Sequence, residues 1–289
     1  MANGILIIDK PQDWTSMDVC AKLRRVLGER RIGHAGTLDP MATGVLPVFV
    51  GRATRAVEFA SEGEKEYLAG LRLGQVTDTQ DTTGTVLETH PVDITLEALE
   101  AALEPFRGNI QQIPPMYSAI KIQGKKLYEL ARKGKEVERP PRDITIHALT
   151  LEEQVNRTDF FIRVRCSKGT YVRTLCHDIG RALGCGGTMF SLRRTMAAGF
   201  TLEQAHPLAV VLEHPDPASL LMPVDTYFAS RPELRLRPEA EKKVRNGMAI
   251  PMPGISDGEY RVYGSDGTFL ALSRVERSKL ITIKSFFAV

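Results

Sequence analysis

The chain has 289 residues, of which 43% are hydrophobic and 25% charged, and its formal net charge is only +3. This composition is ordinary for a globular protein, with enough chain for one large domain and a small one. No apolar run reaches the roughly 18 residues of a membrane span, and the N-terminus lacks the basic start and cleavage site of a secretory signal, so we expect a cytoplasmic protein with no membrane partner.

The first half of the chain mixes strand and helix patterns around one glycine-rich loop. Apolar runs and alternation predict strands, and apolar side chains three or four residues apart predict helices. The predicted elements are a strand at 4–10, a helix at 17–27, the loop at 30–44, a strand at 45–50, a helix at 51–60, a strand at 65–74, a returning hairpin strand at 85–90 and a helix at 95–106.

The second half is richer in strands. The predicted elements are an irregular or edge-like stretch at 107–120, an exposed insertion with a short helix at 121–142, an antiparallel pair at 143–155 and 159–169, a helix at 170–184 and a short helix whose capping box joins Thr201 to Gln204. Short β-rich pieces with Asp-Gly turns then predict a separate small all-β module at 231–289.

Strands and crossover helices do not alternate regularly, which argues against a doubly wound sheet. The expected fold is therefore α+β, with a mixed, mainly antiparallel sheet in a domain at 1–230 and the β-rich module after it.

Positive charge is concentrated locally. Residues 121–142 carry eight Lys or Arg against three Glu, and a second basic cluster covers residues 22–31. Such patches fit a polyanion as partner. A merely solvated basic face is the alternative that composition leaves open.

Several motifs that would indicate other chemistry fail. The stretch GERRIGHAG continues with His34 instead of Lys-Ser/Thr, which excludes a phosphate-binding loop, and DTQDTTG has the wrong spacing for calcium and is typical of a turn with self-bonding side chains. The CHD triplet at 176–178 lacks further ligands, and the four cysteines show no C-x-x-C spacing, so no metal site and no disulfide framework is expected.

One acid stands out. Asp39 lies on the glycine-rich loop next to Pro40, and a stiff loop of this kind can present a nucleophile or a base. A turn aspartate that only caps its own loop is the alternative, which composition alone favours.

A family resemblance changes this balance. The stretch GHAGTLDPMATGVLPV closely resembles the signature of the TruB family of tRNA pseudouridine synthases. Four more stretches resemble the family's other motifs in the family's order, over most of residues 4–210: DKP (9–11), KEYLAGLRLGQVTDTQDTTG (65–84), CSKGTYVRTLCHDIGRALG (166–184) and SLRRTMAAG (191–199).

The resemblance implies an isomerase that makes pseudouridine 55 in the T arm of tRNA, acting as a monomer and without a cofactor. It implies a mobile thumb at about 121–142 and a PUA-like RNA-binding domain at 231–289. The implied site residues are Asp39 as nucleophile, Tyr67 stacking on the base and removing its C5 proton, Arg173 pairing with Asp39, Tyr171 and Leu192 lining the pocket, His34 holding the T loop, and Lys10 supporting the pocket wall near the tyrosine.

The physical chemistry agrees with these roles. A buried Asp drifts toward its neutral form, and a neighbouring guanidinium keeps it ionised. A base inside a folded loop must be flipped out, and it then needs aromatic and apolar packing. Two other readings remain: an RNA-binding tRNA-folding chaperone without essential catalysis, and a guide-RNA-dependent synthase of the dyskerin type.

Overall fold

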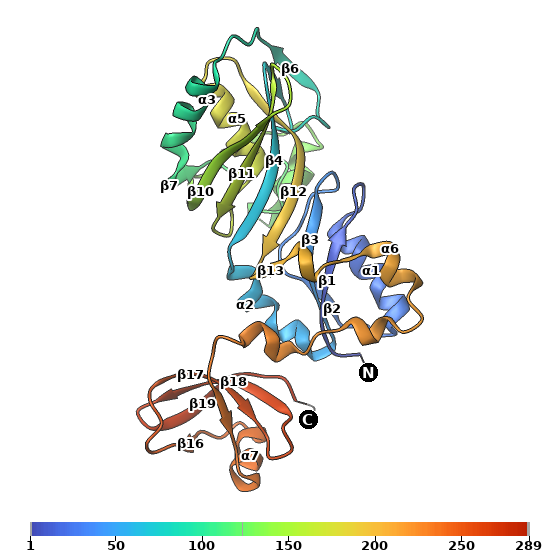
Figure 1. The fold of residues 1–289 in the computed structure, drawn as a ribbon, viewed down its shortest axis with the longest axis vertical. Coiled ribbons are helices and arrows are strands. Elements are labelled where there is room, and N and C mark those ends of the chain that lie inside the picture. Colours follow the sequence, from blue (N-terminus) through green and yellow to red (C-terminus); the bar gives the residue numbers. More distant parts are fainter. Residues whose placement is uncertain (1, 123, 288–289) are drawn as a thin grey trace.

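The computed structural model describes residues 2–122 and 124–287. Gln123 of the basic segment and the last two residues of the predicted β module therefore lie outside the described residues. Two sheet-containing parts follow one another along the long axis, and the C-terminal one lies at the opposite end from α3 and β6 (Figure 1).

The large part is built on a ten-stranded sheet. Its main path runs β14 (His206–Pro207), β1 (Gly4–Lys10), β3 (Thr43–Val50), β12 (Gly187–Ala197), β4 (Lys65–Leu73), β11 (Asp159–Cys166), β10 (Arg142–Gln154) and β7 (Gly108–Gln112); β2 (Ile32–His34) pairs with β3 and β13 (Phe200–Thr201) with β12. Within the described sheet, the β1–β14 and β3–β12 pairings are parallel and the others antiparallel. The predicted mixed, mainly antiparallel α+β fold is confirmed.

Both faces of β1 are buried, which explains its continuous apolar run. Leu6 and Ile8 belong to one core and Ile5 and Ile7 to the other. The first core also takes residues from α1 (Ser16–Leu27), α3 (Leu96–Leu103), α5 (Val172–Ala182) and α6 (Leu208–Glu213). The second takes residues from η1 (Gly51–Ala56), α2 (Val57–Glu62) and η5 (Val224–Phe228).

Local signals in the sequence determine where several helices begin and end. Helix α1 starts with a capping box between Thr15 and Asp18 and stops at Gly28, whose φ is +60°. The Thr201–Gln204 capping box opens η3 (Leu202–Gln204), as predicted. Further 3-10 turns are η2 (Glu104–Phe106) and η4 (Pro217–Leu220).

The turn at 78–84 joins β5 (Gln75–Thr77) to β6 (Val86–Thr89). Asp81 Oδ1 accepts hydrogen bonds from the hydroxyls of Thr79 and Thr83 at 2.8 and 2.5 Å. The predicted hairpin with self-bonding side chains is therefore confirmed.

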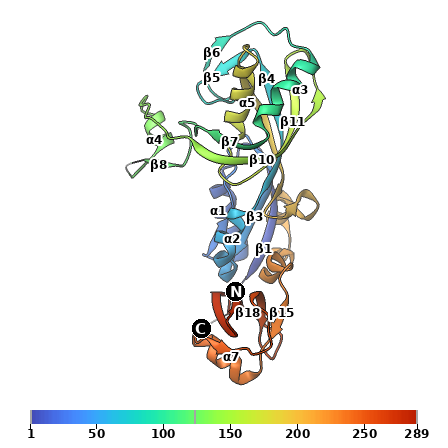
Figure 2. The same ribbon diagram turned by 90° about the vertical axis from the view of Figure 1, so that its left-hand side faces the viewer.

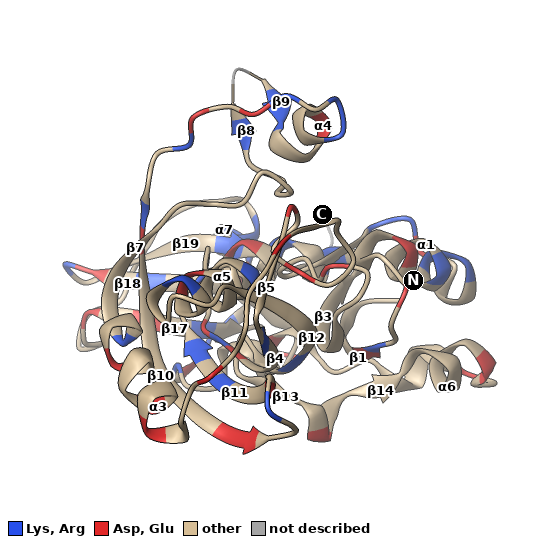
Figure 3. Cartoon of the chain, turned by 90° about the horizontal axis from the view of Figure 1, so that it is seen from above, with Lys and Arg blue, Asp and Glu red and all other residues tan. Residues whose placement is uncertain are grey.

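The basic insertion stands away from the body (Figure 2). It contains β8 (Lys121–Ile122), β9 (Lys125–Lys126) and α4 (Leu127–Ala131), between strands β7 and β10. Seen from above, the blue of Lys and Arg residues marks β8, β9 and the chain just after α4 (Figure 3). We call residues 116–141 the thumb.

The C-terminal part has a five-stranded sheet in the order β15 (Glu233–Arg235), β17 (Gly258–Tyr263), β18 (Phe269–Glu276), β19 (Lys279–Ser285) and β16 (Ile250–Pro251). The prediction of an all-β module was wrong in one respect, because helix α7 (Pro238–Arg245) lies between β15 and β16. Pro238 at its first turn, acids in that turn and basic residues in its last turn account for this helix.

All four cysteines are free and buried. Burial raises the pKa of Cys20 and Cys166 to about 11 and that of Cys176 to about 12. Among the described residues, His, Cys, Asp and Glu side chains form no group of three or more that could hold a metal ion. None of the described helices combines the length and the apolar character that crossing a membrane requires.

Candidate active site

Asp39 lies in the loop between β2 and β3, and the N-terminal segment holds that loop in place. The carbonyl of Pro40 accepts a hydrogen bond from the backbone N–H of Asp13 at 2.8 Å. The hydroxyl of Ser16, buried at the start of α1, accepts one from the N–H of Leu38 at 2.9 Å. The backbone on both sides of Asp39 is therefore fixed.

Arg173 is the ion-pair partner of Asp39. Its Nε lies 3.0 Å from Asp39 Oδ2, and the side chains are 7% and 39% exposed, respectively. The carboxylate thus faces open space, whereas its counter-charge is withdrawn from water and is poorly screened by salt.

The other two guanidinium nitrogens of Arg173 reach different segments. Nη1 donates to the carbonyl of Thr79 at 3.1 Å and lies 3.6 Å from the buried carboxylate of Asp81. Nη2 donates to the carbonyl of Tyr117, at the base of the thumb, at 2.9 Å. One planar side chain therefore joins the loop that carries Asp39, the β5–β6 turn and the thumb, which a lysine could not do.

A cavity of about 900 Å³ opens over Asp39. Five of the seven predicted site residues line it: Asp39, Tyr67, Tyr171, Arg173 and Leu192. They come from the loop between β2 and β3, from β4, from the start of α5 and from β12, so the sheet topology gathers motifs that are far apart in sequence. Tyr128 and Arg132 of the thumb complete the wall.

The aromatic lining is mostly buried. Tyr67 and Leu192 are each 8% exposed, and burial raises the pKa of the Tyr67 hydroxyl while neighbouring Arg194 acts in the opposite direction. Burial also raises the pKa of Tyr171. The backbone of Tyr171 is held at both ends by the side chain of Gln112, with distances of 2.8 and 3.0 Å.

The other two predicted residues do not line the cavity. His34 lies in β2, where burial and Arg194 lower its pKa. Lys10 is fully buried and donates to the carbonyls of Trp14 at 2.6 Å and Pro40 at 3.2 Å. The hydrogen bonds of its ammonium go to backbone carbonyls of the loop that carries Asp39 and of the adjacent N-terminal segment. The expected contact of Lys10 near the tyrosine stays a prediction.

Sequence reasoning missed three buried polar residues of this site. Asp81 was assigned only to its turn, Lys65 only to the strand at 65–74, and Arg194 only to the motif at 191–199; all three line the cavity. The alternation of residues 65–74 places Lys65 on the same face as Tyr67 and Leu71, and a charged residue on an apolar face is the signal that could have identified it.

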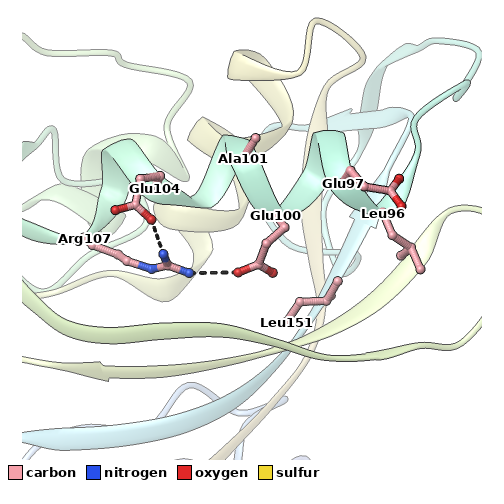
Figure 4. Close-up of a pocket in the computed structure, with 7 residues that line it drawn as sticks. All are labelled: Leu96, Glu97, Glu100, Ala101, Glu104, Arg107 and Leu151. Atoms are coloured by element: carbon pink, nitrogen blue, oxygen red, sulfur yellow. Dashed lines mark hydrogen bonds and ion pairs between the residues drawn. The ribbon is translucent and has the colours of Figure 1, made fainter.

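A second, shallower pocket follows the outer side of α3 (Figure 4). Its cation, Arg107, is already paired with Glu104 and, at 3.0 Å, with Glu100. Leu96 and Leu151 supply the apolar part of its wall. Because the cation of this pocket is already paired, we take the cavity over Asp39, and not this pocket, as the candidate active site.

Comparison with known proteins agrees with this site. Residues 24–172 match the family model "TruB family pseudouridylate synthase (N terminal domain)", and residues 173–229 match "tRNA pseudouridylate synthase B C-terminal domain". Proteins named tRNA pseudouridine synthase B from Clostridium kluyveri and Azoarcus sp. are 41% and 43% identical, covering 98% and 97% of this chain and 99% and 93% of their own lengths.

The fold has solved relatives as well. A crystal structure of a Cbf5-Nop10-Gar1 complex contains a chain with a TM-score of 0.75 and 25% identity, covering 99% of this chain and 85% of that one. Fold, site and matches together define a pseudouridine synthase, an isomerase. Within that class, the chain belongs to the TruB family.

Proposed function

We propose that this enzyme converts uridine 55 in the T arm of tRNA to pseudouridine, with Asp39 as the nucleophile. The observation that carries the proposal is the half-exposed Asp39 carboxylate, paired with buried Arg173, at a cavity lined by Tyr67 and Tyr171. The relatives named tRNA pseudouridine synthase B support tRNA as the substrate.

The geometry suits the reaction. The bond between ribose C1′ and N1 of uracil breaks, the ring turns, and C1′ is joined to C5, which then loses its proton. A carboxylate is needed to attack, and the guanidinium of Arg173, 3.0 Å from Asp39 Oδ2, holds this carboxylate in place at the cavity.

The cavity suits a flipped pyrimidine. A base taken out of a folded RNA loop loses its stacking and must regain packing in the protein. Tyr67, Tyr171 and Leu192 supply two aromatic rings and one apolar side chain. We assign Tyr67 to the base face and to removal of the C5 proton, and Lys10 and His34 to support of the loop and of the RNA.

The thumb and the C-terminal module give the RNA two further surfaces. Exposed Lys121 and Lys125 lie on the thumb, while Arg132 brings a cation to the cavity; RNA loops are recognised largely through shape and phosphate contacts. We assign residues 1–230 to catalysis and residues 231–289 to a PUA-like RNA-binding domain. The active form is a monomer, and it acts in the cytoplasm, where its substrate is found.

The test uses tRNA carrying tritium at C5 of its uridines. The wild-type protein should release one tritium per tRNA molecule, and tRNA with cytidine at position 55 should release none. Binding without release would contradict the enzyme assignment and favour the chaperone reading. Release from the position-55 variant would contradict only the choice of uridine.

Asp39→Asn tests the nucleophile. This variant keeps the size of the side chain, so tRNA affinity should stay near that of the wild type while single-turnover release falls below detection. Substantial residual turnover would remove Asp39 from this role. Asp13→Asn, on the neighbouring segment, is the control and should retain turnover.

A further inference from the structure

Arg194 is a buried cation at the wall of the cavity. It lies in β12 directly opposite Tyr67 of β4 and is 1% exposed. The preceding residue, Arg193, is 40% exposed and pairs with Asp9 at 2.8 Å. Two neighbouring arginines of one strand thus have opposite environments.

The hydrogen bonds of the Arg194 guanidinium go to neutral oxygens. Nε donates to the carbonyl of Val45 at 2.7 Å and Nη2 to that of Gly36 at 3.1 Å. Within the described part of the chain, no Asp or Glu lies at ion-pair distance from it. A buried charge that is not paired destabilises a folded protein, so its presence at the cavity calls for a function.

That function is indicated by Tyr67, which is the cross-strand partner of Arg194 and lines the same cavity. Burial and the negative charge of Asp39 favour the neutral phenol, and Arg194 favours the phenolate. Cys166 is too weak an acid to carry charge near neutral pH. The remaining titratable groups around the pair are Lys10, His34 and Lys65.

We propose that Arg194 is a positioning residue that orients the Tyr67 oxygen and stabilises its phenolate for removal of the C5 proton. The inference rests on the function proposed above. Tyr67 first gives its own proton to water. The C5–H bond then breaks and its proton moves to the phenolate oxygen; the electron pair forms the C5=C6 double bond, and the pair displaced from N1=C6 goes to N1, which takes a proton from water.

The strand pairing makes this arrangement rigid. Arg194 is held on two carbonyls, one of which belongs to the nucleophile loop at Gly36, and Tyr67 is its cross-strand partner. The same guanidinium therefore sets the position of the base relative to Asp39. A preorganised charge of this kind costs no reorganisation during the reaction.

The experiment measures single-turnover rates for Arg194→Lys and Arg194→Met from neutral to alkaline pH, with uridine carrying hydrogen or deuterium at C5. Arg193→Lys on the same strand is the matched control. Each unit by which the pKa of Tyr67 rises should lower the rate about tenfold. The rising limb of the pH profile should move to higher pH, and the deuterium isotope effect should grow, in the Arg194 variants only.

A double variant separates this role from a structural one. In a Tyr67→Phe background, Arg194→Lys should cause no further loss of rate, because both changes remove the same step. Additive losses, an unchanged isotope effect or an unchanged pH profile would overturn the inference. So would unfolding of both Arg194 variants, judged by circular dichroism. If wild-type protein releases no tritium, the proposed function fails instead.

Discussion

At the scale of single residues, Arg173 determines how the site is assembled. Its three nitrogens reach Asp39, the β5–β6 turn and the base of the thumb. Under the function proposed above, closure of the thumb on RNA would act on the same side chain that pairs with Asp39. This offers a direct physical link between substrate binding and the position of Asp39.

Arg173→Lys should keep the charge and lose this geometry. We expect single-turnover tritium release to fall about 100-fold, because small misplacements of reacting groups have effects of this size. The free energy of unfolding should fall by only about 1–3 kcal/mol, the cost of unpaired carbonyls. Tritium-release assays measure the rate, and urea unfolding measures the stability. A loss of stability in proportion to the loss of rate would show a structural role for Arg173 instead.

Lys10 makes stability depend on pH. Burial lowers its pKa from 10.5 to about 8, so between these values the unfolded chain binds the proton and the folded chain does not. Stability attributable to Lys10 should therefore rise with pH across this window, by about 3 kcal/mol.

Urea unfolding of wild type and Lys10→Met, at about pH 7.5 and about pH 10, checks this expectation. The free energy of unfolding of the wild type, relative to that of Lys10→Met, should be larger at the higher pH. Lys279→Met, which changes an exposed lysine, should show no such difference. Equal changes in wild type and Lys10→Met would mean that the Lys10 ammonium is not desolvated.

The residues of the cavity were predictable to unequal degrees. Asp39, Tyr67, Tyr171, Arg173 and Leu192 stand in motifs that resemble a family, and the structure brings them together. Asp81 and Arg194 were not predictable, because a side chain that acts through another residue has no spacing signal of its own. Only the three-dimensional register places Arg194 against Tyr67.

At the scale of elements, strong local patterns were the reliable ones. The capped helices and alternating strands appear as expected, and the stretch 107–120 provides the edge strand β7. The sequence did not predict strand β12, although it is central to the sheet. This strand carries two adjacent arginines, which is unusual for a central strand. The partner of Arg193, Asp9, and the neighbour of Arg194, Tyr67, come close only after the sheet has formed.

The thumb leads to a prediction about salt. Replacing Lys125 and Lys126 with Gln should weaken tRNA binding for any tRNA sequence and make its salt dependence shallower by about 1 to 2 logarithmic units per decade. Filter binding over a salt series measures the slope.

Arg157→Gln is the control. It removes one positive charge from the turn between β10 and β11, which precedes the first residue of β11, whereas Cys166 is the last residue of that strand. It should leave the slope unchanged. An unchanged slope for the thumb variant as well would mean that these two lysines do not touch phosphate.

At the scale of the whole molecule, the C-terminal sheet is packed onto the large part through aromatic rings. Phe228 is fully buried, with its ring centroid 5.6 Å from that of Phe59 and 5.8 Å from that of Phe286. Leu272 and Phe286 of the module share a core with strand β1. The two parts should therefore unfold together.

Phe228→Ala should lower the free energy of unfolding by about 3–5 kcal/mol. The change Leu280→Ala, in the module's own core, should also shift the transition seen by Trp14, the single tryptophan, in the large part. Fluorescence and circular dichroism during urea unfolding report both. If Leu280→Ala left the midpoint of the Trp14 unfolding transition unchanged, the two parts would unfold independently.

The buried cysteines have a practical consequence. All four thiols lie in the large part, and residues 231–289 contain none. Alkylating reagents attack the thiolate and require access to it, so a folded molecule should react slowly. The time course of alkylation, resolved by residue in a mass spectrometer, would give one opening rate for each cysteine. The four rates would report the local opening of α1, β11, α5 and the turn after α5, and no cysteine would have to be introduced by mutation.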